Sequence, residues 1–260
     1  MSNVPVDNFR NEISRNLTRQ RSPAAAPPAS AIYIGNSFFY YNNGVNGHVT
    51  QLLAAAEPTR PWRSTLVAIS GSGADWHDVG SYFRPDAIGR YSFDPDNNVV
   101  FNRIERLFDL ALLMDGSQGP VHPRLKPIFF DFMGRHAATV RAHGAEPIFV
   151  MSWAYADRPG MIDEIASAYS QLGADNDVLV IPVGLAFARA LEKRPGIVLH
   201  APDKRHPSLA GTYLMACAIY GDVFCRSPVG LTYTAELEPD VALFLRESAW
   251  ETLSDFHAAR

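Results

Sequence analysis

The sequence predicts a doubly wound α/β domain, a three-layer α/β/α sandwich around a central parallel sheet of about five strands. Five short apolar runs occur along the chain, and segments with helical spacing of apolar residues separate most of them. Each run is apolar at nearly every position, which is typical of a strand buried on both faces. Such a sheet needs helices on both sides, so one three-layer domain fits the 260 residues better than two domains.

The predicted strands and helices alternate over most of the chain. Apolar and β-branched runs predict strands at residues 32–34, 62–69, 110–114, 147–153 and 178–183. Apolar residues three and four positions apart predict helices at residues 48–57, 126–143, 161–172, 185–194, 209–220 and 239–257.

Two stretches do not fit this alternation. Residues 1–30 are expected to form an extended arm or linker, because the three prolines near its end exclude helix and central strand. The folded domain is then expected to cover residues 31–260. Residues 75–108 contain two prolines and an Asp/Asn-rich run, and are interpreted as an irregular insertion over the sheet edge. Long insertions in compact folds often help to form a substrate pocket.

Composition excludes several classes of partner. The net charge of -4 comes from scattered charges without a clustered Lys/Arg run, so nucleic acid is not an expected partner. No apolar stretch approaches the ~18 residues of a membrane span, and the N-terminus lacks the apolar core of a secretory signal. A cytoplasmic location is therefore predicted, with secretion left open because removal of a leader would leave the same sequence. Cys217 and Cys225 are expected to be free thiols.

Polar and glycine-rich segments follow the predicted strands. They are residues 35–37, 70–73, 115–118 and 154–155. Because ligands of an open parallel sheet bind beyond the carboxyl ends of its strands, these segments are expected to meet at one site.

Ser37 is the first candidate for chemistry. It lies between a strand and a helix, after a glycine that permits a tight turn, and its N–H is expected near a helix N-terminus where negative charge is favoured. The position suits a nucleophile. A serine after a strand is also a common helix cap, so this position alone leaves both roles open.

A second candidate segment lies near the other end of the chain. Pro207 forces His206 out of the helical region, and Ser208 is a good cap for the apolar helix that follows. Asp203, three residues before His206, can accept the Nδ1–H and leave Nε2 facing a serine as general base. The alternative is a surface Asp and His pair that only closes a turn.

Together these segments resemble the sequence blocks of the SGNH (GDSL-like) hydrolases. Residues 32–37, Ile-Tyr-Ile-Gly-Asn-Ser, resemble the first block, and residues 203–208, Asp-Lys-Arg-His-Pro-Ser, resemble the last block, Asp-x-x-His-Pro. Residues 69–73, Ile-Ser-Gly-Ser-Gly, resemble the second block. Residues 113–118, Leu-Met-Asp-Gly-Ser-Gln, lie where the third block, Gly-x-Asn-Asp, is expected. The resemblance covers residues 31–224 and implies an SGNH, flavodoxin-like fold with a triad of serine, histidine and aspartate.

The resemblance also implies an oxyanion hole. Its donors would be the N–H groups of Ser37 and of a second-block glycine, with a third-block amide. Gly71 and Gly73 both fit the glycine, and analogy with Ser-Gly-Asp versions of the block favours Gly71. Gln118 stands where the family has Asn, as in a less-characterised SGNH branch with Ser-Gln at this place. The alternative for Gln118 is a loop amide that satisfies the local backbone.

Four aromatic residues are candidates for substrate binding. Phe38, Trp76, Trp153 and Tyr155 follow the predicted strands or the second block, and could wall a pocket for an acyl or aromatic group. The alternative for such rings is core packing or, at Trp76, a capped short helix. The histidines 122, 136 and 143 do not have metal-site spacing, so no metal is expected.

The resemblance implies a serine esterase that acts on a small or medium acyl ester, including acetyl esters, through an acyl-enzyme and without a cofactor. Two alternatives stay open. One is an acyltransferase to a sugar or alcohol hydroxyl with the same triad, and the other is a ligand-binding module without activity. The natural ester and the oligomeric state are not predicted.

Overall fold

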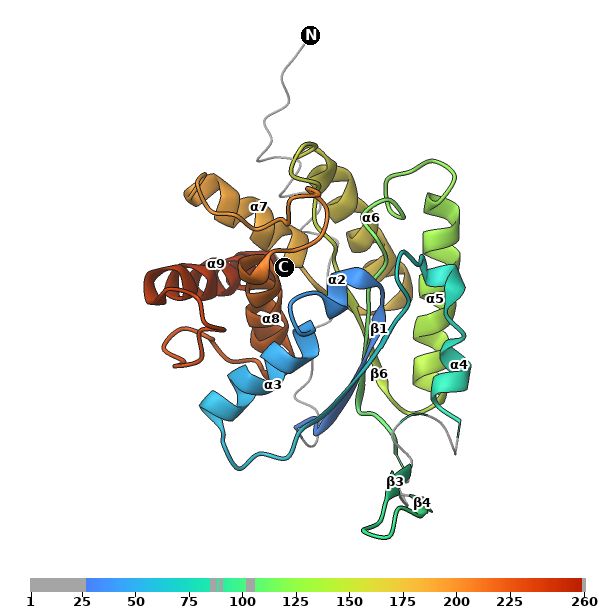
Figure 1. Ribbon diagram of the computed structural model, residues 1–260. Coiled ribbons are helices and arrows are strands. Elements are labelled where there is room, and N and C mark those ends of the chain that lie inside the picture. The colour runs from blue at the N-terminus through green and yellow to red at the C-terminus, as the bar shows by residue number, and fades with distance from the viewer. Residues whose placement is uncertain (1–26, 85–87, 89–90, 102–105, 259–260) are drawn as a thin grey trace.

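Five parallel strands form the central sheet, as the sequence predicts (Figure 1). The computed structural model describes residues 27–84, 88, 91–101 and 106–258. The strands, in the order β2-β1-β5-β6-β7 across the sheet, are β2 (Arg63–Ala68), β1 (Ser30–Gly35), β5 (Leu110–Leu113), β6 (Glu146–Val150) and β7 (Leu179–Ile181). Every neighbouring pair is parallel. The strand order reverses at β1, so the topological switch point lies between β1 and β5.

Helices cover both faces of the sheet and complete the three layers. One face is covered by α3 (Val45–Ala56), α7 (Val183–Lys193), α8 (Leu209–Phe224) and α9 (Pro239–Ala258), which share one apolar core. The other face is covered by α5 (Lys126–Ala142) and α6 (Met161–Asn176), which share the second core. Three short helices follow strands: α2 (Ser37–Tyr40), the 3-10 helix η1 (Ala74–Trp76) and α4 (Val79–Tyr82).

The continuous apolar character of the strands follows from this layering. In β1, Ala31 and Tyr33 face the core under α3 and α8, while Ile32 and Ile34 face the core under α5. All four side chains are at most 2% exposed. A strand between two helical layers therefore needs apolar residues at successive positions and does not alternate with polar ones.

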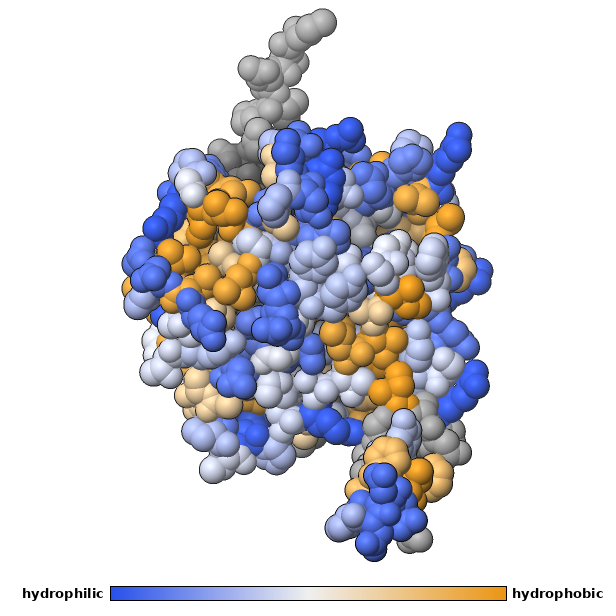
Figure 2. All heavy atoms as spheres, viewed as in Figure 1, coloured by the Kyte–Doolittle hydropathy of each residue, from blue (hydrophilic) through white to orange (hydrophobic). Residues whose placement is uncertain are grey.

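The predicted insertion at residues 75–108 contains more structure than expected. Its described part includes most of η1, α4 and a two-stranded antiparallel hairpin of β3 (Tyr91–Phe93) and β4 (Val99–Phe101). In Figure 1 the hairpin projects from the bottom of the molecule, well away from α2 near the centre of the view. Its apolar residues face solvent (Figure 2), with Phe93 61% and Phe101 62% exposed. The hairpin thus lies away from the carboxyl ends of the strands, and of the described part of the insertion only its first residues lie near them.

The remaining predictions for the chain have mixed outcomes. Both cysteines are free, with Cys217 buried in α8 and Cys225 exposed directly after it. Residues 1–26 of the predicted arm lie outside the described residues, and Ser30 already belongs to β1. In the described part of the chain, no helix is both long and apolar enough to cross a bilayer.

Candidate active site

Ser37 is the first residue of α2, directly after the turn that leaves β1. The helix cap is Asn36, whose Oδ1 accepts a hydrogen bond from the N–H of Phe38 at 3.1 Å. The interpretation of Ser37 as a plain cap is therefore wrong. Gly35 permits the turn, because a Cβ at this position would lie 3.0 Å from both the Met114 carbonyl oxygen and the Phe39 ring. The hydroxyl of Ser37 is thus presented at the carboxyl end of β1.

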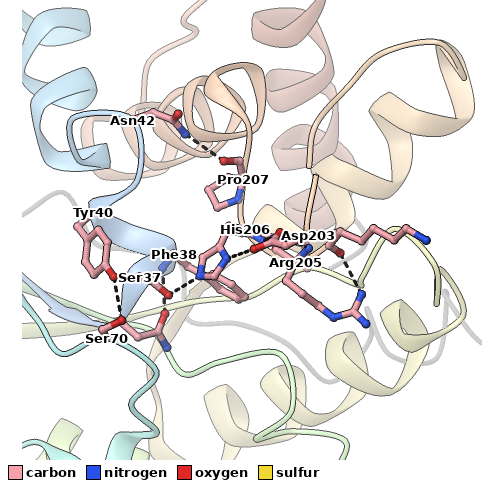
Figure 3. A network of polar contacts seen from close by, with 12 residues as sticks. Ser37, Phe38, Tyr40, Asn42, Ser70, Asp203, Arg205, His206 and Pro207 are labelled. Atoms are coloured by element: carbon pink, nitrogen blue, oxygen red, sulfur yellow. Dashed lines mark hydrogen bonds and ion pairs between the residues drawn. The ribbon is translucent and has the colours of Figure 1, made fainter. Parts of the chain in front are cut away.

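His206 meets this hydroxyl from the loop before α8 (Figure 3). The Ser37 Oγ and the His206 Nε2 are 2.7 Å apart, although the two residues are 169 positions apart in the chain. On the other side of the ring, Nδ1 contacts the Oδ2 of Asp203 at hydrogen-bond range. The structure therefore brings together all three residues of the predicted triad, in the order serine, histidine, aspartate.

Asp203 also shapes the loop that carries the histidine. Its Oδ1 accepts hydrogen bonds from the backbone N–H groups of Arg205 at 2.9 Å and His206 at 3.0 Å. Desolvation works to raise the pKa of Asp203, but the hydrogen bonds from the His206 ring and from these N–H groups outweigh it and lower the pKa to about 2. The carboxylate is therefore ionised at neutral pH and holds the Nδ1–H, which leaves Nε2 to accept the proton of Ser37.

Local backbone contacts fix the histidine loop to the start of α8. The His206 carbonyl oxygen accepts a hydrogen bond from the N–H of Ala201 at 2.8 Å. Ser208 caps α8 through its Oγ, which accepts from the N–H of Gly211 at 3.1 Å, as the sequence predicts. Lys204 completes the turn with a φ of 66°.

Two side chains from distant elements hold the same loop. Asn42, which follows α2, donates from Nδ2 to the Pro207 carbonyl oxygen at 3.0 Å and to the Thr212 Oγ1 at 2.8 Å. Trp153, which follows β6, donates from Nε1 to the Arg205 carbonyl oxygen at 3.0 Å. The sequence contains no signal for Asn42, because its role depends on where the segment after α2 meets Pro207 and Thr212 in the folded chain.

The second block forms a turn on the opposite side of Ser37. Gly71 has a φ of 72°, in the left-handed region, and a Cβ on it would meet no other atom within 4 Å. Gly73 is extended, with a φ of -87°, and a Cβ there would lie 2.7 Å from the Asp75 Oδ1. The Asn36 Nδ2 donates to the Ser72 carbonyl oxygen at 3.1 Å and joins this turn to the segment that carries Ser37. Of the two candidate glycines, only Gly71 has the backbone conformation that requires glycine.

A buried carboxylate lies between the second-block turn and the third-block loop. Asp115, at the end of β5, is 5% exposed, and its Oδ1 accepts the N–H of Gly116 at 2.6 Å. Burial raises the pKa of Asp115 to about 6, although hydrogen bonds from the N–H groups of Gly116 and Ala74 act to lower it. A Cβ on Gly119 would collide with the Asp115 Oδ2. One carboxylate therefore contacts both loops that are expected to supply oxyanion donors, a role that no sequence pattern indicates.

Two buried histidines support the second-block turn from behind. The His77 Nε2 lies 2.9 Å from the Gly35 carbonyl oxygen, and the His136 Nε2 lies 2.8 Å from the Ala74 carbonyl oxygen. A carbonyl only accepts, so each Nε2 carries the proton. Burial lowers the pKa of both rings, which favours their neutral form. His136, which has no predicted role, is thus part of the frame around the site.

Gln118 lies in the third-block loop, with its side chain half-buried. Its carbonyl oxygen accepts the N–H of His122 at 2.8 Å, as at the start of a helical turn. Among the residues that the structure describes, its side-chain amide has no hydrogen-bond partner. The alternative role of satisfying the local backbone is therefore not seen, and the amide is available to a ligand.

The four aromatic candidates have different surroundings. Trp153 is 0% exposed and stacks on Phe38 and on Phe187, with ring centroids 4.5 Å apart in both cases. Its predicted role in substrate contact is wrong, because it lies in the core behind the histidine loop. Phe38 is 6% exposed and meets the His206 ring edge-on at 5.6 Å, so little of it can face a ligand.

The other two aromatic candidates reach the surface. Trp76 is 61% exposed on η1, which directly follows the second block. Tyr155 is half-buried, and the Arg205 guanidinium lies over its ring at 4.0 Å. Arg205 is itself paired with Asp157 at 2.5 Å. Trp76 therefore offers the largest free aromatic surface of the four.

The described residues contain no group of three or more His, Cys, Asp or Glu side chains placed to hold a metal ion. In particular, His136 donates to the Ala74 carbonyl oxygen, and His143 stacks on Phe83 at 5.1 Å.

Comparisons with known proteins give a consistent result for the fold. No family model matches the sequence, and no curated protein matches it. A protein of Slackia heliotrinireducens described as an SGNH hydrolase is 19% identical with a TM-score of 0.52, and the match covers 74% of this chain and 96% of that chain. A DUF4886 family protein of Bacteroides uniformis is 16% identical with a TM-score of 0.61, covering 89% and 96%.

An esterase is also among the similar structures. A variant of an acetylxylan esterase of Geobacillus stearothermophilus is 15% identical with a TM-score of 0.54, covering 76% of this chain and 95% of that chain. Each match spans nearly the whole of the solved structure, so the likeness extends over a complete domain. The chain has the fold of the SGNH hydrolases.

Proposed function

We propose that the protein is a serine esterase that hydrolyses a small or medium acyl ester through a triad of Ser37, His206 and Asp203. The single observation that carries this proposal is the geometry at His206: Nε2 lies 2.7 Å from the Ser37 Oγ, and Nδ1 is held by the ionised Asp203. A serine paired with a neutral, oriented imidazole is the arrangement that activates a hydroxyl as nucleophile.

The proposed reaction has two steps. The Ser37 Oγ attacks the ester carbonyl carbon while its proton passes to the His206 Nε2. The imidazolium then gives this proton to the leaving alcohol as the C–O bond breaks, and the acyl group stays on Ser37. In the second step a water loses its proton to Nε2, adds to the acyl carbon, and releases the acid while Ser37 regains its proton.

The negative charge on the carbonyl oxygen needs donors on the other side of Ser37. We assign this role to the N–H of Ser37, at the start of α2, and to the N–H of Gly71. The left-handed conformation of Gly71 supports its choice over Gly73. The half-buried amide of Gln118 is the third proposed donor. Donors of this kind reduce the barrier most when they are already in place before reaction.

Acetyl esters of sugars are the first substrates to test. The acetylxylan esterase with the same fold motivates this choice. The exposed Trp76 ring, directly after the second block, supports it, because an aromatic face can stack on the apolar face of a sugar ring. Phe38 and Trp153 are too buried to line a large acyl pocket.

A fluorophosphonate probe tests the nucleophile directly. We expect labelling of the wild type and none of Ser37→Ala. Ser70→Ala is a matched control, because this nearby serine bonds only to the Tyr40 hydroxyl at 2.9 Å among the described side chains and should leave labelling unchanged. Absence of labelling in the wild type would favour a ligand-binding module without activity.

Substrate and acceptor need a second assay. A chain-length series of p-nitrophenyl esters is run beside acetylated sugars, with Ser37→Ala and His206→Ala as controls. Because a general base must be unprotonated, we expect activity to fall on acidification. Product analysis with an added alcohol separates hydrolysis from transfer: a new ester in place of the free acid would show an acyltransferase that uses the same triad.

A further inference from the structure

Tyr41 lies face to face with the imidazole of His206. The two ring centroids are 4.2 Å apart and the planes differ by 5°. Phe38, the other ring in contact with His206 in the described part of the chain, meets it edge-on at 85°. Tyr41 directly follows α2, and its N–H donates to the Ser37 carbonyl oxygen at 3.2 Å. The same short segment therefore carries the hydroxyl that faces Nε2 and the ring that covers the face of the imidazole.

We propose that Tyr41 is a positioning residue for His206, which fixes the plane of the imidazole and stabilises its protonated form through the face of the phenol ring. The catalytic part of this inference rests on the proposed esterase function. In that reaction the imidazole becomes positively charged when it takes the Ser37 proton. The stacking itself is a property of the folded chain and does not depend on the function.

The physical basis is the charge distribution of the aromatic ring. Its face is electron-rich, so it attracts a cation placed over it within about 6 Å and attracts a neutral ring much less. The centroid separation of 4.2 Å is inside this range. The attraction is therefore greater for the imidazolium than for the imidazole, and it lowers the barrier only at the stage where the proton has moved. Interactions of this type correspond to about 3- to 30-fold in an equilibrium or rate constant.

Other charged groups lie near His206 and must stay constant in a test. Asp203 holds Nδ1 from the same loop. Arg205, also on this loop, is paired with Asp157 of the segment after β6, at 2.5 Å and 3.4 Å. The helix α8, capped by Ser208, begins three residues after His206 in the chain, and its positive end disfavours a positive charge near it. In the described part of the chain, the Tyr41 ring contacts the rings of Tyr40 and His206 and none of these charged groups. Substitutions at Tyr41 therefore leave these groups in place.

Tyr40 is the matched control. It neighbours Tyr41 in sequence, and the two ring centroids are 5.7 Å apart. Of these two tyrosines, only Tyr41 stacks on the His206 ring. The Tyr40 hydroxyl donates to the Ser70 Oγ at 2.9 Å, on the other side of the segment. Removing the Tyr40 ring therefore disturbs the same chain segment without uncovering the imidazole.

The first experiment measures steady-state hydrolysis of p-nitrophenyl acetate. Tyr41→Leu is expected to lower kcat about 3- to 30-fold with little change in KM, because the lost interaction grows only as His206 is protonated. Tyr41→Phe keeps the ring face and is expected to stay near wild type, as is Tyr40→Leu. An equal loss in Tyr41→Phe and Tyr41→Leu would overturn the role of the ring.

The second experiment does not need ester hydrolysis. The titration of the His206 ring is followed by NMR in a Ser37→Ala background, with the signal assigned by its loss in His206→Asn. Tyr41→Leu is expected to move the titration midpoint to lower pH by about 0.5 to 1.5 units, because the protonated ring loses its partner. Replacing Tyr41 with pentafluorophenylalanine keeps a flat ring of similar shape but reverses the charge of its face, and should give a shift in the same direction even if the leucine variant folds poorly.

The two readouts separate the two hypotheses. If the protein with Ser37 intact hydrolyses no ester, but Tyr41→Leu still shifts the His206 midpoint in the Ser37→Ala background, the proposed function is overturned and the stacking role stays in place. An active enzyme whose midpoint is the same with tyrosine, leucine and pentafluorophenylalanine at position 41 would overturn the stacking role and leave the esterase in place.

Discussion

The two sides of Ser37 are built in different ways. On one side, the proposed general base His206 and its partner Asp203 lie three residues apart on a partly exposed loop. On the other side, the second- and third-block loops are held by Asp115, His77 and His136, all at most 7% exposed. The base side is thus a local motif fastened to the body at a few points, while the oxyanion side is a buried frame made of distant residues.

This difference fits the roles that we propose for the two sides. In the proposed reaction the base side binds and releases protons, which requires access to water and an imidazole with a defined orientation. The oxyanion side would keep donors fixed while charge develops, which requires a rigid setting that does not reorganise. Substitutions on the base side are therefore expected to abolish proton transfer, and substitutions on the oxyanion side to change barrier height, stability or both.

The largest effect is expected from Asp203→Asn. The amide removes the charge that holds Nδ1–H and favours the wrong orientation of the imidazole, so kcat should fall on the order of 10⁴-fold. Asp157→Asn is the control, because Asp157 pairs with Arg205 on the same surface without contacting His206. Steady-state kinetics of the purified variants are the measurement. A similar loss of kcat in both variants would show that any change of charge on this loop lowers activity. It would contradict a specific role of Asp203 in holding His206.

Gln118→Ala is expected to have the next largest effect. If its amide donates to the oxyanion, kcat should fall by about 10² to 10³-fold while the protein still reacts with a fluorophosphonate probe. The side chain has no hydrogen-bond partner among the described residues, so its loss should leave the midpoint of thermal unfolding nearly unchanged. An unchanged kcat would exclude the third-block amide and leave the backbone N–H groups as the donors.

Asp115 gives the oxyanion side its own pH dependence. Its carboxyl has a folded pKa of about 6 against an ordinary value of 3.8, so the native state holds the proton more tightly than the unfolded state. Stability should then decrease as pH rises from about 4 to 6, by about 3 kcal/mol from this group. Asp115→Asn should flatten this slope. Urea unfolding between pH 4 and pH 7 measures it, with the exposed Asp131→Asn as control, and an identical slope in Asp115→Asn would show that another group is responsible.

The smallest effect is expected from Asn42, the side chain that ties the base loop to α2. Asn42→Ala removes the hydrogen bonds to Pro207 and Thr212 and places alanine at a φ of 54°. We expect a loss of about 1–2 kcal/mol in the free energy of unfolding and a few-fold loss in kcat. Asn42→Gly removes the same bonds without the backbone strain. A difference between the two variants measures the strain, and no change in either would show that the loop is fixed by its own backbone contacts.

The base side is easier to predict from the sequence than the oxyanion side, for a physical reason. Asp203, His206, Pro207 and Ser208 interact within one turn of chain, so spacing and residue type contain most of the information. The five strands and their parallel arrangement are predictable for the same reason. Each apolar run indicates by its own composition that the strand is buried on both faces.

The oxyanion side depends on contacts that no local pattern records. In the sequence, nothing distinguishes His136 from other residues of the predicted helix. Its hydrogen bond to the Ala74 carbonyl oxygen forms only because α5 packs against η1 in the folded chain. Either Gly71 or Gly73 could hold the left-handed turn, and only the closed fold decides between them. Trp153 is wrongly predicted at the substrate because an aromatic residue after a strand has the same sequence pattern whether its ring faces a ligand or the core.

Asn36 has a consequence for how the two sides act together. Its side chain accepts from the N–H of Phe38 and donates to the Ser72 carbonyl oxygen, two tasks of opposite polarity that a neutral amide can perform at once. A carboxylate at this position could perform only the first and would repel the carbonyl. Asn36 thus joins Ser37 and the glycine turn through a single uncharged side chain. In the proposed reaction, the negative charge that develops on an ester bound next to Ser37 would then meet no fixed negative charge from the residue before it.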